Sequence, residues 1–143
     1  MSKTVILPID VSQTDAAVAA LDFARDTMNL ADAKVVVLSV MPHIPAYVSS
    51  ELPEEVFANA RTEMETELGK FAAENGLEGR SEIAIRRGAA GREIVECANE
   101  TGADMILISS HDPEFSDIIF GSVAAFVVRH AHCSVVVVRK PKG

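Results

Sequence analysis

Two kinds of hydrophobic pattern alternate along the chain. Short unbroken apolar runs, rich in valine and isoleucine, stop at polar clusters, which is typical of strands buried on both faces. A weaker run at 81–86 alternates polar and apolar residues, which indicates a strand near a sheet edge. The pattern predicts strands over residues 4–10, 35–40, 81–86, 104–108 and 134–138.

Between these runs, apolar residues recur every three or four positions, which predicts amphipathic helices. The helices are expected over residues 12–28, about 54–74, 91–102 and 121–130. Ser12 is expected to be the N-cap of the first helix, with Asp15 in its first turn. Three prolines between residues 42 and 53 predict an irregular stretch.

This order of strands and helices predicts an α/β fold, a single domain over residues 1–143. Strands that alternate with helices form a parallel sheet covered on both faces. Right-handed crossovers leave only a few doubly wound strand orders. In such sheets, ligands bind at the carboxyl ends of the strands, where the winding reverses.

The charge and composition of the chain limit the classes of function that are possible. The formal net charge is −8, and an acidic surface repels nucleic acids and anionic membranes. No apolar run approaches the roughly 20 residues of a membrane helix, and the N-terminus lacks the features of a signal peptide. The sequence therefore predicts a cytoplasmic protein. Cys97 and Cys133 lie far apart and are expected to be free thiols.

The segment S-S-H-D-P-E-F-S-D-I-I-F-G-S, residues 109–122, carries the main candidate chemistry. It joins the end of a predicted strand to the start of a helix. The backbone amides of Gly121, Ser122 and Val123 and the positive helix end favour an anion, and glycine permits close approach. The alternative is that Ser122 only caps its helix.

Three stretches resemble the universal stress protein family over the whole chain. They are V-I-L-P-I-D-V-S at the start, V-V-V-L-S-V in the second strand, and G-S-V-A-A-F-V-V-R-H-A-H-C-S-V-V-V-V-R at the end. The resemblance implies a Rossmann-like sheet of five parallel strands in the order 3-2-1-4-5, with helices on both faces. The nucleotide-binding fingerprint of the family is G-x2-G-x9-G-[S/T]. Ser109 and Asp112 replace its first two glycines, and the shortened loop with S-H-D-P resembles one subgroup.

The resemblance also implies an ATP site, in which ADP or AMP can replace ATP, with or without Mg²⁺. Residues after the first and second strands would line the base and ribose, and the later ones would hold phosphates. The implied site residues are Pro8, Ile9, Asp10, Val40, Ser109, Ser110, Asp112, Gly121, Ser122 and Val123. For Asp10, the alternative is a cap on the first helix.

Charged residues near this site need separate interpretation. Asp112, Glu114 and Asp117 would repel phosphates unless they point to solvent or, for Asp112, contact Mg²⁺ indirectly. The basic cluster of Arg86, Arg87 and Arg92 is interpreted as solvated charge, with help to an anion as the alternative.

The sequence predicts a nucleotide-binding stress-response protein that is regulatory rather than catalytic. Motifs of P-loop hydrolases, dinucleotide oxidoreductases and α/β-hydrolases are missing, and no catalytic or metal-ligating residue is predicted. The alternatives are a very slow ATPase and an interaction protein whose pocket has decayed. Family resemblance implies a homodimer through the last strand, at Val135, Val136, Val137 and Val138.

Overall fold

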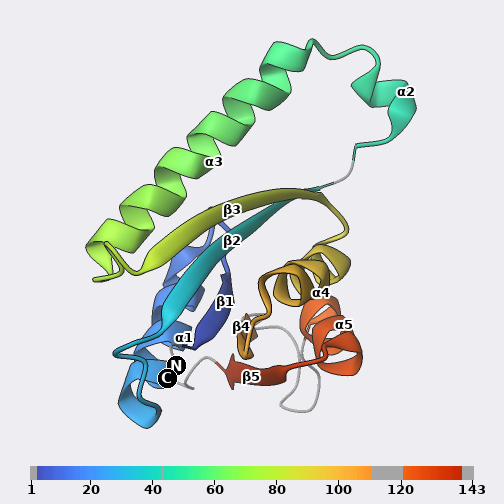
Figure 1. The fold of residues 1–143 in the computed structure, drawn as a ribbon. Coiled ribbons are helices and arrows are strands. Elements are labelled where there is room, and N and C mark those ends of the chain that lie inside the picture. The colour runs from blue at the N-terminus through green and yellow to red at the C-terminus, as the bar shows by residue number, and fades with distance from the viewer. Residues whose placement is uncertain (1–2, 43, 111–120, 140–143) are drawn as a thin grey trace.

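The fold is a five-stranded parallel sheet with the strand order β3-β2-β1-β4-β5 (Figure 1). The computed structural model describes residues 3–42, 44–110 and 121–139. The strands are β1 (Thr4–Pro8), β2 (Lys34–Pro42), β3 (Ser81–Gly88), β4 (Met105–Ser110) and β5 (Ser134–Arg139). The helices are α1 (Thr14–Thr27), α2 (Ala46–Ser49), α3 (Glu54–Glu74), α4 (Ala90–Thr101) and α5 (Ser122–His130). The predicted fold class and strand order are confirmed.

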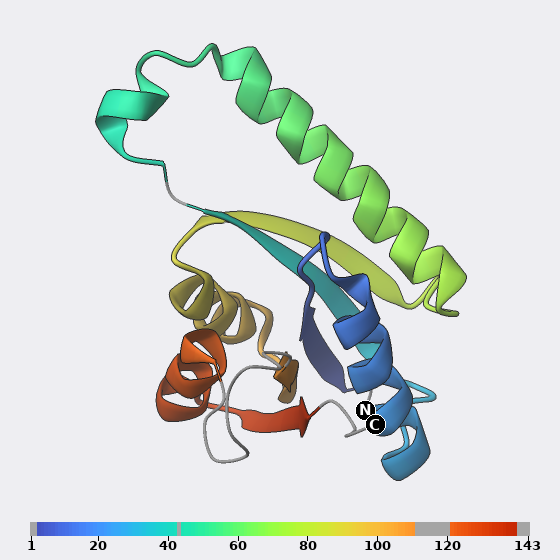
Figure 2. The ribbon, with the colours of Figure 1, turned by 180° about the vertical axis from the view of Figure 1, so that it is seen from behind.

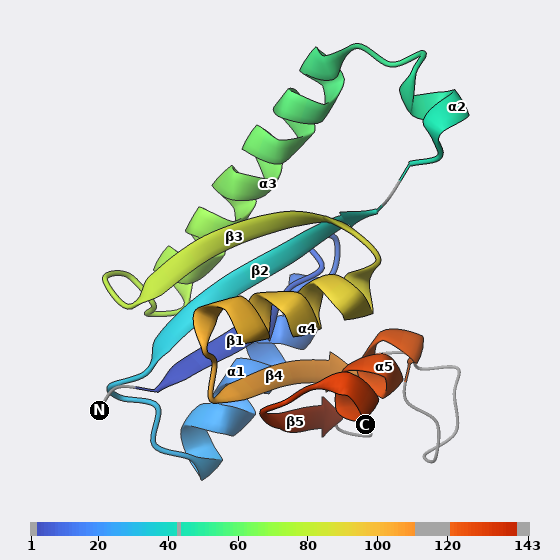
Figure 3. The same ribbon diagram turned by 45° about the vertical axis from the view of Figure 1, so that its right-hand side comes forward.

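Each face of the sheet has its own hydrophobic core. Successive side chains of a strand point to opposite faces, so Val5 and Leu7 pack with α1 and α3, whereas Ile6 packs with α4 and α5. Figure 2 shows α1 in front of the sheet, and Figure 3 shows α4 and α5 in front of it. The continuous apolar strands are explained by this burial on both faces.

One short helix differs from the sequence-based expectation. Helix α2 forms within the stretch predicted to be irregular, directly after Pro45. A four-residue helix is too short to leave a periodic pattern in the sequence. The predicted long helix is confirmed as α3, and its amino-terminal part extends beyond the sheet together with α2 (Figure 1).

The prediction that Ser12 caps the first helix is wrong. Helix α1 begins at Thr14, and its N-cap position is Gln13, which makes no side-chain capping bond. The Ser12 hydroxyl instead donates to Asp10 Oδ1 at 2.6 Å. A hydrogen bond from a hydroxyl to a carboxylate is strong, and it holds Ser12 in the turn before the helix.

The two edge strands have different surfaces. Strand β3 carries charged residues, among them Glu82, Arg86 and Arg87, and Lys34 of β2 forms an ion pair of 2.6 Å with Glu82. Strand β5 carries Val135, Val136 and Val137, all half-buried.

Within the described residues, no helix combines the length and hydropathy needed to cross a membrane.

Replacing Gly91 with alanine is expected to lower the free energy of unfolding by about 1–3 kcal/mol. Gly91 is buried in α4 against α5, and a Cβ there would lie 2.7 Å from Phe126 Cδ1. Urea unfolding followed by circular dichroism measures the change. Gly69→Ala in α3 is the matched control, because its Cβ would lie at an ordinary 3.6 Å from Ile83 Cδ1. Equal effects of the two substitutions would contradict the close packing of α4 on α5.

Candidate functional site

The sheet changes its direction of winding between β1 and β4. Helix α1 follows β1 on one face, whereas α5 follows β4 on the other face, because their buried residues belong to the two separate cores. The two strands are neighbours in the sheet. Parallel strands of this kind leave a crevice at their carboxyl ends, where ligands of doubly wound folds bind. The predicted site residues after β1 and at the end of β4 lie at this edge of the sheet.

At the end of β1, hydrogen bonds fix the chain as it leaves the sheet. The amide of Ile9 donates to the carbonyl of Leu38 at 2.7 Å, and Ile9 is buried. Asp10 is exposed, and its Oδ1 accepts from both the amide and the hydroxyl of Ser12, at 2.9 and 2.6 Å. The carboxylate therefore shapes the turn before α1.

The start of α5 has the local structure that favours an anion. Gly121 is the N-cap, with φ −55° and ψ 160°, and its carbonyl accepts the amide of Ala125 at 3.0 Å. The first amides of a helix have no partner within the helix and carry its positive end. Ser122 is the first helical residue, so the alternative that it is the N-cap is wrong.

Gly121 is not required by its backbone conformation, because its φ is negative. A Cβ built there would meet no described atom within 4 Å. Among the described residues, nothing fills the position that a side chain at Gly121 would take. A glycine also permits another group to approach the backbone closely.

The other predicted site residues that the structure describes lie in β1, β2, β4 and the first turn of α5. Pro8 ends β1 and is half-buried, as is Val40 in β2. Ser109 in β4 is half-buried and lies opposite Val138 of β5, and Ser110 is the last residue of β4. Val123, in the first turn of α5, is 37% exposed. Asp112 lies outside the described residues, as do His111, Glu114 and Asp117.

Arg86 is not solvated charge, contrary to the interpretation from the sequence. Its Nε donates to Glu93 at 2.9 Å, and its Nη1 donates to Glu100 at 2.7 Å. Glu96 lies 3.8 Å from Nη2. The hydrogen bond to Glu100 has the largest effect on the pKa of Arg86 and raises it, and the bond to Glu93 raises it further. The bond from Arg86 lowers the pKa of Glu100. Arg86 therefore ties β3 to α4.

A sequence signal for this cluster exists in the spacing of its acidic residues. Glu93, Glu96 and Glu100 are three and four positions apart, which places them on one face of a helix. A cation on the adjoining strand is their natural partner. Arg87 is engaged differently, because its guanidinium lies 4.1 Å from the ring centre of Phe57 in α3.

Both cysteines are free thiols in the structure, as predicted. Cys97 is buried and Cys133 is half-buried. Burial raises the pKa of each thiol, which keeps it in the protonated, less reactive form. Among the described residues, histidine, cysteine and carboxylate side chains form no group of three that could hold a metal ion.

Two relatives match nearly the whole chain. Universal stress protein MJ0531 of Methanocaldococcus jannaschii is 34% identical over 149 residues, which cover 98% of this chain and 84% of the relative. Universal stress protein G of Escherichia coli O157:H7 is 32% identical over 150 residues, which cover 97% of this chain and all of the relative.

Solved structures share the fold. Hypothetical protein MJ0577 superposes with a TM-score of 0.80 at 25% identity, covering 100% of this chain and 99% of that one. A universal stress protein in complex with cAMP has a TM-score of 0.63 at 23% identity and covers 95% of both chains. A family member from Arabidopsis thaliana with AMP bound has a TM-score of 0.63 at 19% identity, covering 97% of this chain and 92% of that one.

The sequence model of the universal stress protein family matches residues 1–139, almost the full length of the chain. That match agrees with the identities to the two relatives and with the shared sheet order. The chain therefore belongs to the universal stress protein family.

Proposed function

We propose that this protein binds an adenine nucleotide, with ATP as its main ligand, at the carboxyl ends of β1 and β4, and that binding is regulatory rather than catalytic. The observation that carries the proposal is the open amino-terminal end of α5 at the switch point of the sheet. Phosphate groups bind well where unpaired helix amides and the helix dipole point at them.

The phosphate part of the site consists of Gly121, Ser122 and Val123. The space in front of Gly121 admits a phosphate oxygen, and the exposed Ser122 supplies a hydroxyl donor. Mg²⁺, when it accompanies ATP, is held mainly by phosphate oxygens and water in sites with few carboxylates.

The base and ribose part of the site consists of Pro8, Ile9, Asp10 and Val40, with Ser109, Ser110 and Asp112 toward the first phosphates. A carboxylate at Asp10 suits the vicinal hydroxyls of a ribose, since each hydroxyl donates one hydrogen bond. The structures with cAMP and with AMP support this part, because the same fold holds an adenine nucleotide in those two proteins.

Two arginines near the carboxyl end of β3 argue against phosphoryl transfer. Catalysis of that reaction relies on cations aimed at the transferred phosphate. Arg86 is bonded to glutamates of α4, and Arg87 lies over Phe57. Neither arginine is directed at the helix end that would hold the phosphates, which supports a binding role.

The proposal includes a homodimer and a cytoplasmic location. The half-buried valines Val135, Val136 and Val137 on the edge strand β5 would become fully buried if two copies paired there, antiparallel across a two-fold axis. Occupancy of the nucleotide site would then report the energy state of the cell through a dimeric protein.

Isothermal titration calorimetry with ATP, with and without Mg²⁺, tests nucleotide binding. We expect saturable binding of about one ATP per chain below roughly 1 mM, with ADP and AMP titrated in parallel. Heat changes indistinguishable from dilution at millimolar ATP would favour the alternative of a decayed pocket in an interaction protein. Phosphate release measured on the same samples identifies the alternative of a slow ATPase.

A further inference from the structure

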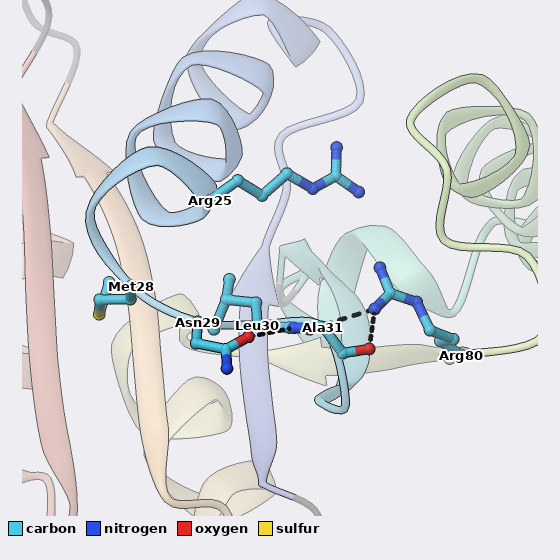
Figure 4. A pocket seen from close by; sticks show the side chains of 6 residues that line it. All are labelled: Arg25, Met28, Asn29, Leu30, Ala31 and Arg80. Atoms are coloured by element: carbon cyan, nitrogen blue, oxygen red, sulfur yellow. Dashed lines mark hydrogen bonds between the residues drawn. The ribbon is translucent and has the colours of Figure 1, made fainter.

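A pocket lies at the opposite end of the sheet from the proposed nucleotide site. It is about 210 Å³ in volume and is lined by Arg25, Met28, Asn29, Leu30, Ala31 and Arg80 (Figure 4). These residues belong to the end of α1, the loop that leads to β2, and the turn before β3. Because β2 and β3 both begin here, the pocket lies at the amino ends of the strands, and the proposed nucleotide site does not use it.

Hydrogen bonds to backbone carbonyls hold the two arginines in place. Arg80 Nη1 donates to the carbonyls of Leu30 at 3.1 Å and Ala31 at 2.5 Å. Arg25 Nη2 donates to the carbonyl of Asn75, in the turn after α3. Arg80 thus reaches across the pocket to the backbone of the loop, and Arg25 is held by the turn after α3. Figure 4 shows both guanidinium groups extending toward the same space above the loop.

The loop beneath them is also fixed. Asn29 Oδ1 accepts the amide of Ala31 at 3.1 Å, and Leu30 is buried. Arg25 is exposed and Arg80 is half-buried, so the pocket is open to solvent while its walls are bonded to the fold. Because hydrogen bonds already hold these side chains and the loop, little conformational entropy is lost when a ligand binds.

The charge of the pocket contrasts with that of the molecule. The chain has a formal net charge of −8, and Arg61 and Arg86 are paired with glutamates. Neither Arg25 nor Arg80 forms an ion pair with a carboxylate of residues 3–42, 44–110 or 121–139. A guanidinium has five N–H donors, and the bonds to carbonyls use one nitrogen of each group.

We propose that this pocket binds the phosphate group of a small molecule between Arg25 and Arg80. Guanidinium groups match phosphate oxygens in geometry and charge. An anion between the two guanidinium groups would also offset the repulsion between their positive charges. Met28 and Leu30 form an apolar wall beside the charged groups. A ligand there would hold the loop after α1 and the turn before β3 together. The proposal does not depend on ATP binding at the other end of the sheet.

Titration of the full-length, ¹⁵N-labelled protein with inorganic phosphate and with glycerol 3-phosphate, at constant ionic strength set by sodium chloride, tests the proposal. We expect saturable NMR shift changes in the amides of residues 28–31 and 75–80. Tighter binding of glycerol 3-phosphate assigns the site to phosphate esters, and tighter binding of inorganic phosphate assigns it to the free ion. Shift changes confined to residues 121–123 would overturn the proposal without affecting the nucleotide site.

Arg25→Gln is the variant of choice, because Arg25 is exposed and the substitution leaves the Arg80 bonds to the loop in place. We expect the dissociation constant at this pocket to rise about tenfold, the loss typical of a charged hydrogen-bond donor. Arg61→Gln on α3 removes the same charge from an exposed site paired with Glu65 and is the matched control. Equal dissociation constants for Arg25→Gln and Arg61→Gln would overturn the proposal.

Discussion

Replacing Gly121 with valine is expected to weaken ATP binding by roughly ten- to a hundredfold, which corresponds to the loss of one charged hydrogen bond. The valine side chain would occupy the space before the first amides of α5, where a Cβ meets no described atom within 4 Å. Its φ of −55° is accessible to valine, so the substitution acts on the ligand rather than on the backbone. Calorimetry on wild type and variant measures the change.

Ala125→Val is the matched control for this substitution. Ala125 is exposed one turn further along α5, so the same kind of side chain is added to the same helix at a distance from the amides. We expect Ala125→Val to bind ATP like the wild type. If Gly121→Val retained the wild-type affinity, the phosphates would have to bind elsewhere, and the proposed site would be wrong.

Replacing Val136 with lysine is expected to convert a dimer into a monomer. In an antiparallel pairing of two β5 strands, the substitution would bring two ammonium groups into an apolar contact, and burial of an unpaired charge is strongly unfavourable. We expect the dimer dissociation constant to rise roughly a hundredfold or more. Sedimentation equilibrium measures the mass, and circular dichroism checks that the variant is folded.

Val56→Lys is the control for charge and solubility. Val56 lies in the first turn of α3, in the part of the helix that extends beyond the sheet, and is 47% exposed. This variant should keep the mass of the wild type. A folded Val136→Lys protein that remained dimeric would show that β5 is not the contact between copies.

The sheet was predictable from the sequence because its strands are buried on both faces. Runs such as Val35 to Leu38 have to be apolar throughout, and all of these residues are almost fully buried. The long helix α3 was equally clear, since Leu68 and Phe71 follow the helical period on its buried side. These features depend on burial along one element, which a sequence displays directly.

Contacts between distant elements were harder to predict. The role of Arg86 depends on glutamates of α4, and the pocket of Arg25 and Arg80 joins residues 55 positions apart. Ser12 was misassigned for a local reason, because the carboxylate of Asp10 competes for its hydroxyl. The amino-terminal end of α5 was predicted correctly, since glycine and serine at a helix start act through the backbone itself.

The difference between the two edge strands limits how far copies of the chain can add to one another. Two β5 strands that pair across a two-fold axis use up the apolar edge of both molecules, so the assembly closes at two. Pairing of β5 with β3 of a further copy would instead repeat without end and give a filament. The charges of Glu82, Arg86 and Arg87 on β3 oppose that contact. In the proposed dimer, the charged edge would therefore protect the protein against open-ended polymerisation.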